Sequence, residues 1–184
     1  MGLVVFGGSS TPSDAAPEAD HTGFAGALKP PGARAPGFRL RDQDGRVVTM
    51  DDYRGRDVIV TFMYSTCQDT CPLTASQIRA GIDALGHDVP VLIVSVDPRD
   101  DTPFHMKRFL VKEQLAGRAD FVTGTRAQLA PIWKRYGVQP QLGKQFDHTA
   151  ETVIVDGRGL QRVGYLSSLL TPEDLTHDLR ALGA

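Results

Sequence analysis

The sequence predicts an α/β fold, in which a mixed central sheet forms the middle layer of a three-layer sandwich. Two apolar, β-branched runs, residues 58–64 and 89–96, are each followed by a helical pattern. This alternation is typical of parallel strands connected by helices. A turn signal at residues 156–159 separates two further strand patterns, so a hairpin adds antiparallel pairing before a last helix closes the chain.

A small β-hairpin is expected to open the domain. Residues 38–41 and 47–49 fit two short strands, and the Asp-Gln-Asp-Gly turn of residues 42–45 lies between them. A glycine in so short a connection is a hairpin signal.

The two cysteines fall where the first buried strand meets a helix. Residues 58–64 contain neither glycine nor proline, as expected for a strand covered on both faces. Pro72 suits the first turn of a helix, and apolar residues then recur at roughly helical spacing: Leu73, Ile78, Ile82 and Leu85. Cys67 and Cys71 therefore connect a strand to a helix.

Capping signals mark the later helices. Thr102 precedes Pro103 as an N-cap precedes a first turn, and Thr125 with Gln128 forms a capping box. We expect helices from residue 103 to about 115, over 127–136, and after Thr171, with strands at 121–122, 152–155 and 160–166. This order of elements is that of the thioredoxin fold.

Length and composition favour one domain with a tail. The chain has 184 residues, of which 41% are hydrophobic, enough to bury a core. Its 20 basic and 22 acidic residues give a net charge of -2 without a block of like charge. An extended phosphate-binding surface is therefore not expected, which disfavours nucleic acid as a partner.

The first 35 residues are expected to be a flexible tether, and residues 36–184 the folded domain. Between residues 7 and 35 the chain is mainly Gly, Ser, Thr, Pro, Ala, Asp and Glu, a composition that buries too little surface to offset chain ordering. The apolar start, residues 1–6, is far shorter than a membrane-spanning helix, which needs about 20 residues. It fits a trimmed membrane anchor, and the sequence alone does not establish export.

The cysteine pair carries the chemistry. Two cysteines in one short segment argue against a disulfide-stapled scaffold and for a paired redox or metal function. Cys71 falls at the expected helix start, where free N–H groups and the helix dipole favour a thiolate. A thiolate is both the nucleophile of disulfide exchange and a soft ligand for Cu(I), so both functions stay open. An inert disulfide or two buried thiols is the structural alternative.

A third metal donor is available in His148, which lies just before the strand at 152–155. A soft metal held by two thiolates commonly needs such a donor, although a lone loop histidine is often solvated. The other histidines are expected to face solvent: His21, His87, His105 and His177. Asp97 is expected to be structural, because residues 97–103 form a good turn and helix start.

Three ordered blocks resemble the Sco/SenC family. They are YSTCQDTCP at residues 64–72, VSVDPRDDTP at residues 94–103 and DHT at residues 147–149. The Thr-Gly-Thr of residues 123–125 also fits this family. The resemblance extends from about Phe38 to the C-terminal helix, so that only the tether lies outside it.

This resemblance implies a membrane-tethered copper-binding protein that helps assemble the dinuclear copper centre of cytochrome c oxidase. It implies that Cys67, Cys71 and His148 bind Cu(I) or Cu(II), and that Asp147 orients the site or faces a partner. The implied partners are the copper-receiving subunit of a terminal oxidase and another copper chaperone. The implied location is outside the cytoplasm, at the cytoplasmic membrane. A metal-transfer protein of this kind need not catalyse a reaction.

Two details bear on the choice between copper handling and dithiol exchange. Gln68 stands where the family commonly has a proline, so the loop is expected to be less rigid. Many thioredoxin-like oxidoreductases place a cis-proline before the strand that faces the cysteines, whereas residues 146–156 contain no proline. This difference favours copper.

The main alternative is a thiol-disulfide oxidoreductase that reduces the cysteines of the copper recipient, with Cys67 attacking and Cys71 resolving. A thiol peroxidase is a weaker alternative, because the sequence carries no distinctive peroxide-binding motif. Zinc also suits thiolate and imidazole ligands, but a closed structural zinc site needs a fourth protein ligand that the sequence does not identify.

Overall fold

The computed structural model describes residues 23–139 and 151–183, and its centre is a six-stranded mixed sheet in the order β1-β8-β7-β4-β5-β6. Strands β4, β5 and β6 run parallel, whereas β7, β8 and β1 are added antiparallel. The strands are β1 (Ala27–Leu28), β4 (Val58–Met63), β5 (Val91–Ser95), β6 (Ala119–Val122), β7 (Glu151–Val155) and β8 (Gln161–Leu166). The predicted opening hairpin is also present, as a separate pair of β2 (Arg39–Arg41) and β3 (Val47–Thr49).

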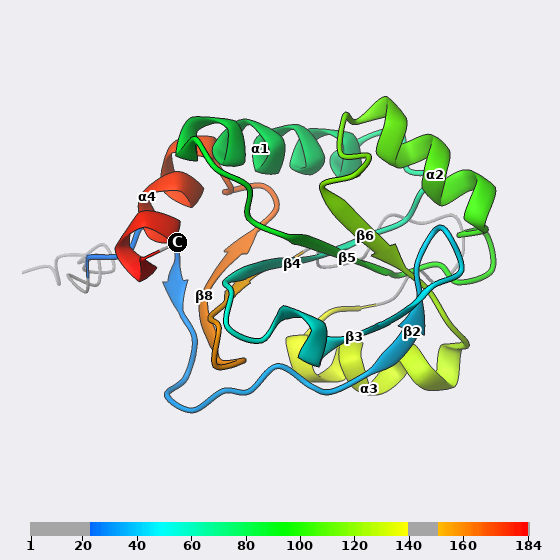
Figure 1. The fold of residues 1–184 in the computed structure, drawn as a ribbon, viewed down its shortest axis with the longest axis horizontal. Helices are drawn as coiled ribbons and strands as arrows, with labels where there is room; N and C mark the ends of the chain where they lie inside the picture. The colour runs from blue at the N-terminus through cyan, green and yellow to red at the C-terminus, as the bar shows by residue number, and fades with distance from the viewer. Residues whose placement is uncertain (1–22, 140–150, 184) are drawn as a thin grey trace, which may run out of the picture.

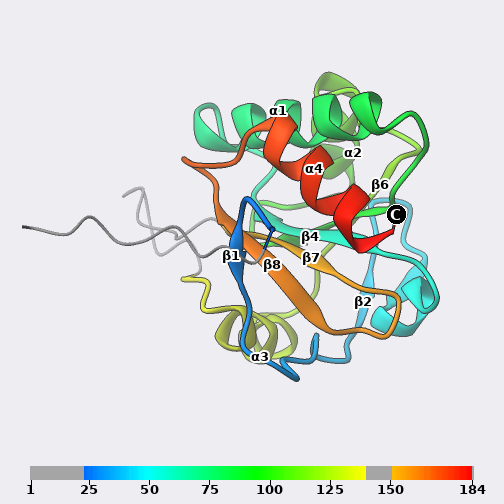
Figure 2. The same cartoon turned by 90° about the vertical axis from the view of Figure 1, so that its left-hand side faces the viewer.

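Helices cover both faces of the sheet (Figure 1). In that view and in Figure 2, α1, α2 and α4 lie on one side of the strands and α3 lies on the other. The helices are α1 (Thr70–Leu85), α2 (Pro103–Lys112), α3 (Arg126–Tyr136) and α4 (Pro172–Leu182), with a short 3-10 helix at Met50–Tyr53. The three-layer α/β sandwich with a mixed sheet is therefore confirmed.

Strand β4 forms the centre of the core. Each of its side chains is at most 1% exposed, as its apolar, β-branched sequence predicts. Phe62 packs against Tyr136 of α3, with ring centroids 5.0 Å apart. Thr61 is the polar exception, and its hydroxyl lies 2.9 Å from the hydroxyl of Thr152 on β7. A buried hydroxyl needs such a partner, so the pair fixes the register of β4 against β7.

One edge of the sheet gathers the features that matter for function. Strands β4, β5 and β6 all end there, and α1, α2 and α3 begin there, an arrangement that places ligand sites at this edge in open α/β folds. The hydroxyls of Thr102 and Thr125 accept hydrogen bonds from backbone N–H groups at the starts of α2 and α3. Both caps were predicted. We call this edge, which carries the β4–α1 connection, the thiol edge.

The ordered structure begins earlier than the sequence predicts. Residues up to 35 were expected to be tether, yet Ala27–Leu28 pair with β8 as strand β1. Asp178 of α4 also accepts hydrogen bonds from the backbone N–H groups of Ala25 and Gly26, at 2.8 and 2.9 Å. Residues 25–28, which we call the N-terminal strap, are thus ordered by backbone hydrogen bonds that hydrophobicity does not reveal. Residues 1–22 lie outside the described part of the chain.

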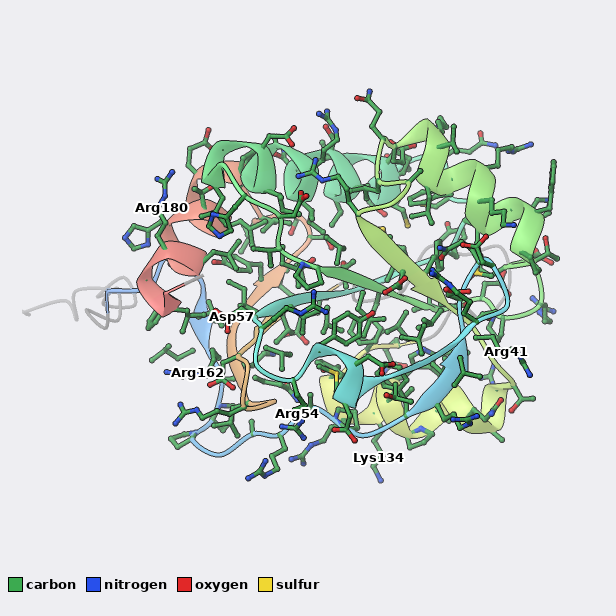
Figure 3. The ribbon with its side chains drawn as sticks, viewed as in Figure 1. Arg41, Arg54, Asp57, Lys134, Arg162 and Arg180 are labelled. Atoms are coloured by element: carbon green, nitrogen blue, oxygen red, sulfur yellow. The ribbon has the colours of Figure 1, made fainter. Side chains whose placement is uncertain are left out.

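Charged side chains are spread over the surface. In Figure 3, Arg41 beside the β2–β3 turn and Arg180 on α4 lie at opposite ends of the molecule. Several cations are neutralised locally; Arg118, for example, contacts Asp83 and Asp88 at 2.6 and 3.1 Å. Within the described ranges, no helix combines the length and the apolar character that crossing a membrane requires.

Candidate metal centre

The two cysteines lie where the sequence places them, between β4 and α1. Cys67 ends a tight turn in which its backbone N–H donates to Tyr64 O at 3.2 Å. Cys71 is the second residue of α1. Both side chains are buried, at 5% and 2% exposure, and both are free thiols. The backbone N–H of Cys71 donates to Cys67 Sγ at 3.4 Å, so the two residues face one another at the thiol edge.

The surroundings of Cys67 favour ionisation of its thiol. Its pKa is lowered well below that of an ordinary thiol, chiefly because the thiol of Cys71 donates a hydrogen bond to its sulfur. Burial opposes this shift, but the backbone N–H groups of Asp69 and Cys71 and the hydroxyl of Tyr64 support it. Several donors converge on one sulfur, which is how a protein stabilises a thiolate.

The sequence analysis expects the helix start to favour a thiolate at Cys71, whereas the structure gathers the hydrogen-bond donors on Cys67. The pKa of Cys71 is raised, because its thiol donates to Cys67 and because it is buried. The free N–H groups at the start of α1 point back toward the sulfur that precedes the helix, which belongs to Cys67. The helix start therefore favours a thiolate as predicted, but on the other cysteine.

Two residues near the thiols have roles that the sequence does not reveal. Tyr64 is 7% exposed, and burial followed by its hydrogen bond to Cys67 raises its pKa. Asp101 is 2% exposed and accepts hydrogen bonds from Ser65, which belongs to the turn that ends at Cys67. A β-branched run that ends in a tyrosine looks like any buried strand, and Asp101 looks like part of a helix start.

Asp97 behaves as a turn residue. Its carbonyl accepts hydrogen bonds from the backbone N–H groups of Asp100 and Asp101, at 3.2 and 3.0 Å. Its carboxylate lies 3.7 Å from the side chain of Arg99. These contacts agree with the structural role that the sequence predicts.

The expected third ligand, His148, and its neighbour Asp147 lie outside the described residues, as does His21. Of the other histidines, His87 and His177 are exposed. His105 is half-buried, with Nδ1 2.8 Å from the carbonyl of Asp100. Over residues 23–139 and 151–183, no group of three His, Cys, Asp or Glu side chains has the arrangement of a metal site.

The described part of the site therefore offers two facing sulfurs, and the surroundings of Cys67 favour its thiolate form. Two thiolates are suited to a soft ion such as Cu(I), and the same two sulfurs can also form a disulfide. The geometry supports both chemistries.

Comparison with known proteins identifies the family. Residues 27–183 match the sequence model of the SCO1/SenC family. Protein SenC of Rhodobacter capsulatus is 31% identical over 130 residues, which cover 65% of this chain but only 57% of SenC. The chain thus spans little more than half the length of this curated relative.

Two solved structures share the fold. The ScoI protein of Bradyrhizobium japonicum, solved with copper bound, is 28% identical, with a TM-score of 0.67 and coverage of 82% of this chain and 99% of ScoI. A SCO1/SenC family lipoprotein from Bacillus anthracis is 25% identical, with a TM-score of 0.73 and coverage of 86% of this chain and all (100%) of that one. With the family match extending from β1 to the end of α4, the chain belongs to the SCO1/SenC family.

Proposed function

We propose that this protein binds copper through Cys67, Cys71 and His148 and delivers it during assembly of the dinuclear copper centre of cytochrome c oxidase. The observation that carries the proposal is the facing pair of sulfurs at the thiol edge, with hydrogen-bond donors gathered on Cys67. Metal ligation needs a thiolate, and the lowered pKa of Cys67 makes one available without a large cost of deprotonation.

Copper is the metal that the relatives favour. The ScoI protein of Bradyrhizobium japonicum, which shares the family and the fold, was solved with copper bound. Thiolates are soft ligands and imidazole is a borderline one, and together they suit Cu(I). A site with these three donors also has room for an additional ligand when Cu(II) binds. His148 is the third ligand in this proposal, on the strength of the Asp-His-Thr block that resembles the family.

The ion is cargo, so it must leave the site again. Transfer proceeds by ligand exchange, in which a sulfur of the recipient replaces a sulfur of this protein on the ion. The recipient is the copper-receiving subunit of a terminal oxidase, and a second copper chaperone is the donor. We place the domain outside the cytoplasm and held to the membrane, as the lipoprotein relative from Bacillus anthracis suggests.

A Cu(I) titration of the reduced protein tests the proposed ligands. We expect one Cu(I) per chain, with the affinity lost by orders of magnitude in Cys67→Ala and Cys71→Ala. His148→Ala should weaken binding about tenfold or more, because the ion loses one of three donors. His87→Ala is the matched control, since His87 is exposed and lies beyond the opposite end of α1.

Equal Cu(I) affinity in wild type and His148→Ala would remove His148 from the ligand set. Equal affinity in wild type and both cysteine variants would refute the copper site itself.

The pKa of Cys67 is lowered and that of Cys71 is raised, which favours a second candidate function, thiol-disulfide exchange with the recipient. Cys67 thiolate would attack a disulfide sulfur of the recipient, and that recipient's other sulfur would leave as a thiolate. Cys71, once deprotonated, would then attack Cys67, forming the Cys67–Cys71 disulfide and releasing the recipient as a dithiol. Two electrons pass to the recipient, and an external thiol reductant is needed for another turn. Unchanged exchange by His148→Ala, together with weak copper binding by the wild type, would favour this function.

A further inference from the structure

A buried carboxylate joins the cysteine turn to the rest of the thiol edge. Asp101 is 2% exposed and precedes the N-cap of α2. Its Oδ1 accepts two hydrogen bonds from Ser65, one from the backbone N–H at 2.7 Å and one from the hydroxyl at 2.6 Å. Its Oδ2 accepts a hydrogen bond from the hydroxyl of Ser95 at the end of β5. A buried carboxylate is costly, so three donors aimed at one such group call for a reason.

The two bonds from Ser65 pin the turn that presents Cys67. The turn runs from Tyr64 to Cys67 and is closed by the bond from Cys67 N–H to Tyr64 O. Ser65 is its first central residue, and both its backbone and its side chain are held by the same oxygen. With the turn held in this way, Cys67 Sγ lies 3.4 Å from the backbone N of Cys71.

Asp101 is itself held by hydrogen bonds in the β5–α2 connection. Its backbone N–H donates to the carbonyl of Asp97 at 3.0 Å, and Thr102 beside it caps α2. Ser95 is fully buried, and its carbonyl accepts a hydrogen bond from the indole of Trp133 on α3 at 2.9 Å. The carboxylate thus links the cysteine turn to β5 and α2 directly, and to α3 through Ser95.

We propose that Asp101 is a positioning residue for the thiol pair, which holds the Cys67 turn in the arrangement of the reduced pair, so that both sulfurs can meet one ion. Asp101 acts through Ser65 and does not itself contact the cargo. This inference rests on the proposed function for its copper readout only, because the reduction potential of the cysteine pair reports the same positioning without any metal.

The central experiment compares Asp101→Ala with Asp178→Ala. Both changes remove a buried carboxylate that accepts backbone N–H and hydroxyl bonds, but Asp178 lies on α4, where it holds the N-terminal strap and Tyr165. We expect Asp101→Ala to weaken Cu(I) binding about tenfold, while Asp178→Ala keeps the wild-type affinity. The potential of the Cys67–Cys71 couple should fall in Asp101→Ala by about 30 mV, a tenfold change in its equilibrium constant, because the stabilised dithiol form is lost.

A conservative variant separates positioning from charge. In Asp101→Asn, the remaining oxygen can accept both bonds from Ser65, and the new amide can donate to the hydroxyl of Ser95. We therefore expect Asp101→Asn to keep Cu(I) affinity and potential within about threefold of the wild type. A charge effect would instead give Asp101→Asn the same change as Asp101→Ala, and that result would overturn the positioning role.

The proposal is also overturned if Asp101→Ala matches Asp178→Ala in both affinity and potential. Should Asp101→Ala fail to fold, Ser65→Ala decides, since Ser65 is only half-buried and loses one bond to Oδ1. It should weaken Cu(I) binding and shift the thiol equilibrium about threefold, and wild-type values for both would refute the inference. Failure of the wild type to bind Cu(I) would refute the proposed function instead, while the potentials would still test Asp101.

Discussion

Two buried carboxylates hold two distant parts of this molecule, and their environments have opposite effects on their charge. Asp101 fixes the cysteine turn and Asp178 fixes the N-terminal strap. Burial raises the pKa of Asp101 to about 6, because its three hydrogen bonds do not offset desolvation and Asp97 lies nearby. Burial also acts on Asp178, but hydrogen bonds from Tyr165, Ala25, His177 and Gly26 outweigh it and lower the pKa.

The opposite pKa shifts indicate different roles for the two carboxylates: Asp178 stabilises the fold, whereas Asp101 holds the turn at the thiol edge. The charged form of Asp178 is stabilised by folding, so it contributes to stability above its unfolded pKa and loses that contribution as the pH falls through its folded pKa. The charged form of Asp101 is disfavoured by folding. A buried carboxylate whose charged form is disfavoured, and which holds the turn before Cys67, is better explained by the position of the turn than by the stability of the fold.

The largest effect is expected from removing the strap's anchor. Asp178→Ala removes the acceptor shared by four donors: the N–H groups of Ala25 and Gly26, the hydroxyl of Tyr165 and the ring of His177. Hydrogen bonds to a charged group contribute about 1.5–3 kcal/mol each, and the more exposed donors can turn to water, so the free energy of unfolding should fall by about 4 kcal/mol. Urea denaturation measures this change. A loss under about 1 kcal/mol would show that the strap does not depend on Asp178.

The pH dependence of stability tests the difference between Asp101 and Asp178. Its folded pKa of about 6 lies above the ordinary value of 3.8, so the folded state binds more protons between these values, and stability decreases as the pH rises through this window. The difference corresponds to about 3 kcal/mol, at about 1.4 kcal/mol per pKa unit. Relative to Asp101→Asn, the wild type should therefore lose about 3 kcal/mol between about pH 3 and about pH 7.

Urea denaturation of both proteins across that range provides the measurement. Parallel stability curves would show that Asp101 titrates normally and would remove the contrast with Asp178.

The smallest effect is expected from the ion pair between an exposed arginine and a buried aspartate in the same β5–α2 connection. Arg99 is exposed, and its side chain lies 3.7 Å from the Asp97 carboxylate. Because the arginine is solvated and the separation is long, the pair contributes little, so Arg99→Ala should change the free energy of unfolding by less than about 0.5 kcal/mol. Calorimetric melting would reveal a larger change, which would mean that charge in this connection matters beyond the buried carboxylate.

The sequence predicts the parts of the fold that depend on local patterns. The buried strand β4, the caps at Thr102 and Thr125 and the final hairpin follow from periodicity and capping chemistry, and the structure confirms them. The position of the thiols between a strand and a helix start follows from the same patterns. These features involve residues that are close together in the chain.

Features that depend on distant contacts were missed. The bond from Ser65 to Asp101 joins residues 36 positions apart, and the bonds from the strap to Asp178 join residues more than 150 apart. Neither carboxylate has a local signal, because Asp101 fits a helix start and Asp178 fits a helix. The sequence gives the position of the helix start beside Cys71, but not that its backbone N–H points toward the sulfur of Cys67.

In the proposed function, Cys67 and Cys71 hold one copper ion together. X-ray absorption at the copper edge of the Cu(I)-loaded protein tests it most directly. Two sulfur neighbours per copper are expected, with a nitrogen neighbour that disappears in His148→Ala, and one sulfur neighbour in Cys67→Ala. A copper environment without sulfur, or one that is the same in the wild type and Cys67→Ala, would contradict the claim.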